Sequence, residues 1–345
     1  MITPKNLLIV RTDRIGDVVL SLPMAGIVKS KFPGCRITFL VREYTRALVN
    51  EHPDIDSVII LKESKKKIFF RENIEQISKE KFDSCIIVSP NFIISLILFF
   101  SKIKNRIGTG YRWYSFLFNH KIFQHRKYSE MHELEFNVKM LSLFGINEKV
   151  NKENVHFNLI PADNIKVNEL LVENGITDNK PLIIIHPGSG GSAADLPVNK
   201  FKELVAKFLA DNNIQSIVTG AESEKKLCEA ICMSEKIKNF AGMFEIKELI
   251  SIINKADIFI SNSTGPLHIA AALSKIVIGF YPKKLACSAE RWGPYSNKSF
   301  VFKPNNDCPD CKREQCINTE CMNSIDIKEV YTVIKNELNE LEPEK

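Results

Sequence analysis

The run NLLIVRTDRIGDVVLSLP, residues 6–23, decides the fold of the first half of the chain. Its first five residues are mostly apolar and predict a buried strand of a parallel sheet, and the apolar residues after Asp17 recur at helical spacing. The pair Gly16–Asp17 therefore lies where the strand has turned into a helix. A carboxylate in a first helical turn is favoured by the exposed N–H groups, so Asp17 is either a helix cap or a residue that performs chemistry.

Outward from this run, apolar strands and helical patterns alternate along nearly the whole chain. Further strands are expected at RITFLV (36–41), SVIIL (57–61), DSCIIVS (83–89), PLIII (181–185), SIVTGAE (216–222), ADIFISNS (256–263) and KIVIGFY (275–281). This repetition predicts an α/β fold with two doubly wound parallel sheets wrapped by helices. The expected domains are residues 1–160 and 161–323, followed by a terminal helix within 324–345. Ligands are expected in a cleft at the carboxyl ends of the strands.

The composition, 44% hydrophobic and 26% charged over 345 residues, is typical of a soluble protein too long for one core. No signal peptide is recognised, because Met1–Asn6 lead straight into a strand-like run, so a cytoplasmic location is expected. The longest apolar run, FIISLILFF (92–100), is too short to cross about 30 Å of hydrocarbon. It is interpreted as a buried helix face, with contact at a membrane surface as the alternative.

Charge is divided unevenly along the chain. Residues 1–160 hold 25 Lys and Arg against 16 Asp and Glu, whereas the remainder holds 22 against 25. The basic first part fits an anionic partner or an anionic membrane surface. A lysine-rich solvated surface explains the same charge equally well.

Three turns in the second domain could hold a nucleotide diphosphate. HPGSGG (186–191) contains glycines whose N–H groups can approach an anion closely. NSTGPLH (262–268) opens a helix, with Thr264 as the expected N-cap. GAE (220–222) ends the strand between them, and Glu222 could accept hydrogen bonds from a ribose or cap the next helix. Each turn alone is as consistent with plain structure, but three at strand ends of one domain favour a nucleotide.

Four of the nine cysteines form a cluster at short spacing: Cys308, Cys311, Cys316 and Cys321. Disulfides are not expected without a secretion signal. Four thiolates could surround a structural zinc or iron tetrahedrally, and reduced, unliganded cysteines are the alternative. No aromatic and basic interleaving accompanies the cluster, so nucleic acid is not an expected partner.

Together these features resemble glycosyltransferase family 9, the ADP-heptose:lipopolysaccharide heptosyltransferases. The landmarks are RTDRIGDVVLSLP, RIGTGYRW (106–113), HELEFNVKMLSLFGI, HPGSGG, GAESE, FAGMFEIKELISIINKADIFISNSTGPLHIAAAL and the cysteine-bearing tail before CMNSIDIKEV, and they cover nearly the whole chain in order. The resemblance implies the GT-B fold, two Rossmann-like domains facing a central cleft, with acceptor bound in the first and donor in the second. It also implies that the terminal helix crosses back to the first domain.

The resemblance further implies an inverting glycosyltransferase that moves heptose from ADP-heptose to a lipopolysaccharide or lipooligosaccharide core, without a metal in catalysis. Asp17 is implied as the general base that activates the acceptor hydroxyl. The implied donor-binding residues are Ser189, Gly190, Glu222, Met243, Ser263, Thr264, Gly265 and His268. Arg11 and Arg14 are weaker candidates for contact with an anionic, lipid-linked acceptor, which would bring the chain to the cytoplasmic face of the inner membrane.

Three positions depart from the family pattern. Ala194 stands where many members have a basic residue, Leu196 where they have Trp, and Ser263 where many have Asp. The cation for the diphosphate would then have to come from Lys200, Lys202 or Arg14. The alternatives left open are a transferase with another donor or acceptor, a GT-B-like nucleotide-sugar epimerase, and a catalytically weak or non-catalytic relative.

Overall fold

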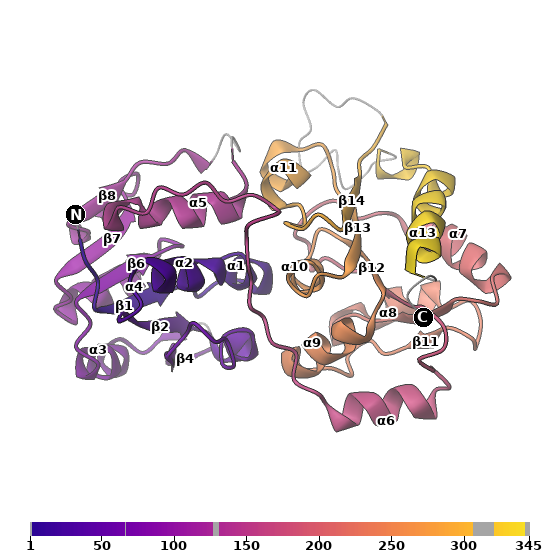
Figure 1. The fold of residues 1–345 in the computed structure, drawn as a ribbon, viewed down its shortest axis with the longest axis horizontal. Coiled ribbons are helices and arrows are strands. Elements are labelled where there is room, and N and C mark those ends of the chain that lie inside the picture. Colours follow the sequence, from indigo (N-terminus) through magenta and orange to yellow (C-terminus); the bar gives the residue numbers. More distant parts are fainter. Residues whose placement is uncertain (1, 66, 127–130, 306–320, 342–345) are drawn as a thin grey trace. The chain divides into compact units, whose positions relative to one another are not determined.

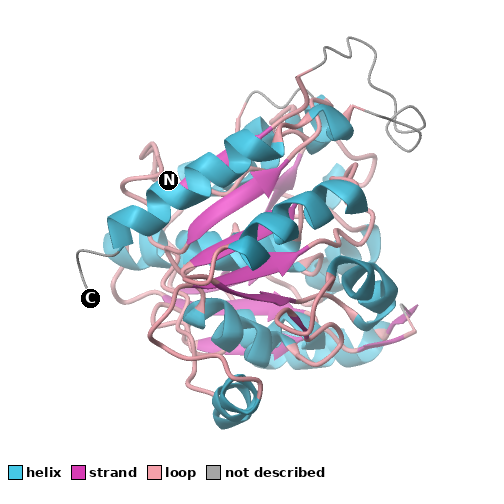
Figure 2. Cartoon of the chain, turned by 90° about the vertical axis from the view of Figure 1, so that its right-hand side faces the viewer, coloured by secondary structure: helices cyan, strands magenta, loops and turns pink. Residues whose placement is uncertain are grey.

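The computed structural model describes residues 2–65, 67–126, 131–305 and 321–341. The chain divides into two compact units, one ending at Ile160 and the other beginning at Pro161 (Figure 1). Each unit is an α/β layer structure built on its own parallel sheet, and Figure 2 shows the strands as arrows with helices beside them. The α/β class and the parallel sheets expected from the sequence are therefore confirmed.

The first unit contains a six-stranded sheet in the order β3-β2-β1-β6-β7-β8, with every pair parallel. Its strands are β1 Asn6–Val10, β2 Arg36–Val41, β3 Ser57–Ile60, β6 Ser84–Ile87, β7 Asn105–Thr109 and β8 His120–Ile122, and β4 Glu63–Ser64 pairs with β5 Lys67–Ile68 outside this sheet. Its α-helices are α1 Ile15–Val19, α2 Pro23–Lys31, α3 Phe70–Lys79, α4 Phe92–Phe100 and α5 Glu133–Lys139.

The second unit repeats this plan in the order β11-β10-β9-β12-β13-β14, again parallel throughout. Its strands are β9 Leu182–His186, β10 Gln215–Val218, β11 Lys238–Asn239, β12 Ile258–Asn262, β13 Ile276–Phe280 and β14 Ser299–Phe302. Its α-helices are α6 Ile165–Glu173, α7 Val198–Ala210, α8 Lys225–Ile231, α9 Ile246–Lys255, α10 Gly265–Ala272, α11 Ala289–Trp292 and α13 Ile327–Leu341.

In both units the strand order reverses beside the first strand, between β1 and β6 and between β9 and β12. Loops leaving neighbouring strands on opposite faces separate at such a switch point, which is where open α/β sheets bind ligands. Asp17 lies in α1, the short helix that follows β1, and HPGSGG begins at the last residue of β9 and forms the loop after it. Both stretches singled out in the sequence thus lie at a switch point of their own sheet.

The last helix belongs to the core of the second unit. Ile327, Val330, Ile334 and Leu338 of α13 are buried in the same apolar cluster as residues of α7. Lys335 of α13 also pairs with Asp211 at 2.8 Å, just after α7 ends, and Figure 1 shows the two helices side by side. The resemblance predicts a terminal helix that crosses to the first domain, whereas the apolar face of α13 packs on the second unit.

The apolar run 92–100 forms α4, and only part of it is buried. Ile94, Ile97 and Leu98 pack in the core of the first unit, as the sequence predicts. Phe92, Ile93, Phe99 and Phe100 remain exposed. Within the described residues, no helix is both long and apolar enough to pass through a bilayer.

Candidate active site

In the first unit, the turn after β1 gathers charged side chains around Arg11. The Arg11 guanidinium is 1% exposed and forms an ion pair with Asp17, and its Nε lies 2.9 Å from Oδ1 of Asp13. Burial alone would lower the pKa of Arg11, but the charges of Asp13, Asp17 and Glu133 outweigh it and raise that pKa. Arg11 is therefore a fixed cation that orients the carboxylates around it.

A second layer on α5 fixes Arg11 from the other side. Oε1 of Glu133, a buried residue, lies 3.5 Å from Arg11 Nη2 and also pairs with Arg126. Asn137 accepts a hydrogen bond from Arg11 at 3.4 Å and donates to the carbonyl of Leu20 at 3.0 Å. Because α5 lies more than a hundred residues from β1 in the sequence, this support could not be read from the run 6–23.

Asp17 and Asp13 are the carboxylates of this cluster that stay within reach of solvent. The side chain of Asp17 is 15% exposed and that of Asp13 is 28% exposed, against 2% for Glu133. Burial raises the pKa of Asp13, and the Asp17 charge adds to the rise against the opposing charge of Arg11. The geometry offers a proton acceptor on each side of a buried guanidinium.

The two arginines named as acceptor contacts differ in placement. Arg14 is exposed at the start of α1. Arg11 cannot offer its guanidinium to an acceptor here, because the side chain is buried among three carboxylates. The sequence prediction for Arg11 is therefore corrected from acceptor contact to support of Asp17.

In the second unit, the turns after β9, β10 and β12 meet. Asn262 at the end of β12 donates to the carbonyl of Pro187 at 2.6 Å and accepts from the N–H of Leu196 at 2.8 Å. Glu224, in the turn after β10, accepts from the N–H of Gly190 at 3.2 Å. The loop 187–197 is thus held at both its edges by side chains that the sequence reasoning did not select.

Glycines let this loop take its shape. Gly190 has a φ of +57° and Gly191 of +74°, a region that residues with a Cβ rarely adopt. A Cβ on Gly188 would lie 2.0 Å from the carboxyl carbon of Glu224. The Glu224 carboxylate already occupies one N–H of the loop, so an anion-binding arrangement exists there with a carboxylate as its present partner.

Glu222 and Met243 form a separate part of the site. The Glu222 side chain is 74% exposed and lies over Gly242, where a Cβ would approach its Oε2 to 1.9 Å. Met243, the next residue, is 41% exposed. The structure therefore brings these two predicted donor residues together, while Glu224 is the one that faces the HPGSGG loop.

The start of α10 agrees with the sequence prediction. Thr264 is the N-cap with an extended backbone, and Pro266 lies in the first turn, as expected. The Thr264 side chain makes no capping hydrogen bond. Ser263 and His268 are both buried, and so is Ser189 beside the loop glycines.

Two titratable groups beside the loop have shifted pKa values. Burial lowers the pKa of His186 to about 4, although the charge of the Glu224 carboxylate, 4.0 Å from Nε2 of His186, acts to raise it. Desolvation raises the pKa of Asp195 to about 6; the charge of Glu224 adds to this, and the Ser189 hydroxyl opposes it. The loop is therefore flanked by a neutral imidazole and by carboxylates.

This arrangement was compared with known proteins. The glycosyltransferase family 9 (heptosyltransferase) model matches residues 71–322. The chain belongs to glycosyltransferase family 9. It is 30% identical, over 96% of its length and 97% of the other's, to a Haemophilus influenzae protein whose own assignment as a glycosyltransferase is provisional.

Solved structures show the same fold for this glycosyltransferase. A family 9 glycosyl transferase from Veillonella parvula matches with a TM-score of 0.82 and 18% identity, covering 97% of both chains. The ADP-heptose lipopolysaccharide heptosyltransferase II of Escherichia coli matches with a TM-score of 0.75 and 17% identity, covering 98% of this chain and 99% of the other. The chain therefore has the GT-B fold with two Rossmann-like units, and it is a glycosyltransferase of the heptosyltransferase family.

The departures from the family pattern have a structural setting. Leu196 is 3% exposed and Ala194 packs against the same apolar cluster, so this part of the loop turns toward the core. Lys200 and Lys202 lie nearby in sequence, in the first turns of α7. Ser263 hydrogen-bonds with Tyr281. Burial raises the pKa of Tyr281, and the hydrogen bond with Ser263 acts to lower it by less.

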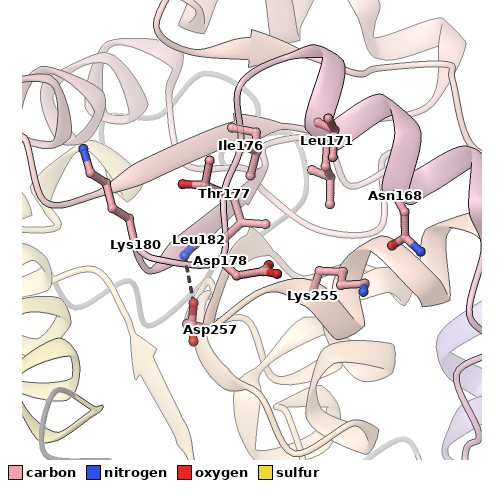
Figure 3. A pocket seen from close by; sticks show the side chains of 10 residues that line it. Asn168, Leu171, Ile176, Thr177, Asp178, Lys180, Leu182, Lys255 and Asp257 are labelled. Carbon is pink, nitrogen blue, oxygen red and sulfur yellow. Dashed lines mark hydrogen bonds between the residues drawn. The ribbon is translucent and has the colours of Figure 1, made fainter. Parts of the chain in front are cut away.

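A pocket of about 570 Å³ lies elsewhere in the second unit (Figure 3). Leu182, which opens β9, donates to Asp257 at 2.8 Å across it, and Lys255 ends α9 beside it. These are amino ends of strands, the sheet edge opposite to the HPGSGG loop. The pocket is therefore not part of the candidate active site of this glycosyltransferase.

The cysteine cluster falls largely outside the described residues. Of its four members only Cys321 is described, partly buried against the core of the second unit. In the described part of the chain no group of three or more His, Cys, Asp or Glu could hold a metal ion. The zinc or iron expectation for Cys308, Cys311 and Cys316 lies outside that part.

Proposed function

We propose that this glycosyltransferase transfers heptose from ADP-heptose, with inversion, to a hydroxyl of a lipopolysaccharide or lipooligosaccharide core acceptor. The observation that carries the proposal is the convergence of three turns at the carboxyl edge of the second sheet, in a family 9 chain. Support for the donor comes from likeness to an ADP-heptose heptosyltransferase.

In this proposal, the N–H groups of the HPGSGG loop and of the start of α10 bind the diphosphate, as helix N-termini and glycine turns do. The Glu222 carboxylate accepts hydrogen bonds from the ribose hydroxyls, and Met243 packs on the nucleobase. The phosphate would compete with Glu224 for the N–H of Gly190. The leaving diphosphate is stabilised by these fixed donors, without a metal ion.

Asp17 acts as the general base on the acceptor hydroxyl. Its carboxylate is directed by the buried Arg11, which in turn is held by Glu133 and Asn137. The acceptor is an anionic, lipid-linked glycan at the cytoplasmic face of the inner membrane, and it binds in the first unit. The excess of basic residues in that part of the chain suits such an acceptor.

The test combines nucleotide binding with product analysis. Thermal shift with ADP, UDP and GDP should show the largest rise in melting temperature with ADP, because a ligand that binds only the folded state stabilises it. ADP-heptose with a heptose-free core acceptor should then yield ADP and an acceptor one heptose heavier by mass spectrometry, in buffer containing EDTA.

The same assay separates the alternatives. A sugar nucleotide changed in the absence of acceptor indicates an epimerase, and transfer from another sugar nucleotide indicates a different donor. Binding of ADP without transfer to any core acceptor would contradict the proposed reaction.

A further inference from the structure

Helix α4 carries an apolar face that the described chain covers only in part. Its outward positions follow helical spacing, and none is polar: Phe92, Ile93, Leu96, Phe99 and Phe100. Phe100 is 51% exposed and Phe99 is 43% exposed. A helix that is apolar all round is usually buried on every side, so this outward face indicates an apolar neighbour.

Aromatic rings from the loop after β7 extend this face. The ring of Phe92 lies 4.8 Å from that of Trp113, and Trp113 lies 6.5 Å from Phe116. Trp113 is 73% exposed and Phe116 is 65% exposed, the largest exposures among the aromatic side chains described. We call Phe92, Ile93, Phe99, Phe100, Trp113 and Phe116 the aromatic surface.

Along the segment that carries the aromatic surface, the charge is of one sign. Residues 84–129 contain seven Lys and Arg and no Asp or Glu. Lys102 and Lys104 follow the end of α4, and Arg112 precedes Trp113; all three are exposed. The Arg106 guanidinium lies over the ring of Phe99, 5.2 Å from its centroid.

We propose that the aromatic surface inserts into the headgroup region of an anionic phospholipid bilayer. Aromatic rings partition to the boundary between headgroups and acyl chains, and Trp is enriched there. Lys102, Lys104 and Arg112 contact the lipid phosphates at the rim of the surface, where anionic lipid attracts basic side chains. The segment 84–129 itself contains no Asp or Glu that an anionic membrane would repel.

The direct test uses tryptophan emission, because the chain has two tryptophans. In a Trp292→Phe background, vesicles of phosphatidylethanolamine and phosphatidylglycerol should shift the emission of Trp113 to the blue and carry the full chain upward in flotation. Vesicles of phosphatidylcholine alone should do neither. No substrate is present, so the result does not depend on the proposed reaction.

Two variant sets and their controls separate apolar from charge contributions. Phe99→Ser with Phe100→Ser should lower vesicle partitioning roughly tenfold or more, since each ring removed is apolar area that no longer enters the bilayer. Lys102→Glu, Lys104→Glu and Arg112→Glu together should do the same for anionic vesicles and make the remaining binding insensitive to salt. As controls, Ile165→Ser with Val172→Ser and Lys226→Glu with Lys236→Glu change exposed residues of the second unit and should leave partitioning unchanged.

Melting curves and ADP binding of each variant confirm that it is folded. The proposal is overturned if wild-type protein does not float with anionic vesicles, or if the second-unit controls reduce flotation as much as the aromatic variants. It is likewise overturned if sedimentation shows self-association that Phe99→Ser with Phe100→Ser abolishes while lipid binding is absent; the surface would then bind a second copy of the chain.

Discussion

At the scale of single residues, the cluster around Arg11 has two candidate bases, and substitution distinguishes them. Asp17→Asn removes the proposed base and should lower turnover about 10²- to 10⁴-fold, while ADP affinity is retained because the donor turns are in the second unit. Asp13→Asn, an equally conservative change beside the same guanidinium, should have a much smaller effect. Steady-state kinetics with calorimetric ADP titration measures both. If Asp13→Asn causes the larger loss, Asp13 is the base.

A second residue-scale prediction concerns His186 and pH. Its pKa is about 4 in the folded chain against an ordinary value of 6.5, so the unfolded chain takes up this proton first as the pH falls. The contribution of neutral His186 to the stability of the folded chain is complete above pH 6.5 and is lost as the pH falls through 4. The size of the loss is about 3 kcal/mol.

His186→Gln should therefore flatten the stability of the chain between pH 6.5 and 4, measured by urea unfolding at several pH values. The Gln amide can still bond Thr219, which His186 contacts at 3.0 Å. Asp195 contributes with the opposite sign, because its raised pKa favours the folded state at low pH, but it is common to both proteins and cancels in the difference. The exposed His156→Gln serves as the control, and an equal flattening there would refute the assignment.

At the scale of elements, the loop 187–197 depends on one side chain of β12. Asn262→Ala leaves the N–H of Leu196 and the carbonyl of Pro187 without their partner in a buried setting. The free energy of unfolding should fall by about 2–4 kcal/mol. Asn199→Ala, which removes an exposed amide bonded to Asn323, should change it by less than about 0.5 kcal/mol. Denaturant unfolding compares the two, and equal losses would mean that the loop is held by other contacts.

The strands and helices that the sequence predicts are those with a strong local pattern. NLLIV, RITFLV and LIIIH are mostly apolar because both faces of a parallel sheet are covered, and they form β1, β2 and β9. The strands β7 (NRIGT) and β14 (SFVF) are only partly buried and lie toward one edge of their sheets, and neither short run is predicted as a strand. Edge position, which depends on the whole sheet, is not encoded in a short run.

The candidate site divides in the same way. Glycine turns after apolar strands are visible in sequence, and HPGSGG and the start of α10 were found by that signal. Glu224, Asn262 and Glu133 were not, because each acts through a contact dozens of residues away. Glu222 and Glu224 are chemically equivalent, and which of them faces the loop depends on the register of the 3-10 turn Glu222–Glu224. The sequence alone does not determine that register.

At the scale of the whole molecule, each unit has its own sheet and its own switch point, so a donor bound as proposed should protect one unit selectively. Hydrogen exchange with and without ADP measures this, since amides that bind phosphate or pack under it open less often. Slower exchange is expected in residues 187–197, 219–224 and 262–268, with no change in residues 11–23.

The control for that comparison is Gly188→Ala, whose Cβ would displace the Glu224 carboxylate from the loop while leaving β9 and β12 paired. Exchange in 187–197 should then be faster without ADP, and ADP should still slow it, because the phosphate no longer competes with Glu224 for the N–H of Gly190; the first unit should be unaltered. Protection of 11–23 by ADP in the wild-type chain would place the nucleotide at the first unit instead. The carboxylate cluster around Arg11 argues against that outcome, because Asp13, Asp17 and Glu133 would repel a diphosphate that the loop glycines of the second unit can hydrogen-bond.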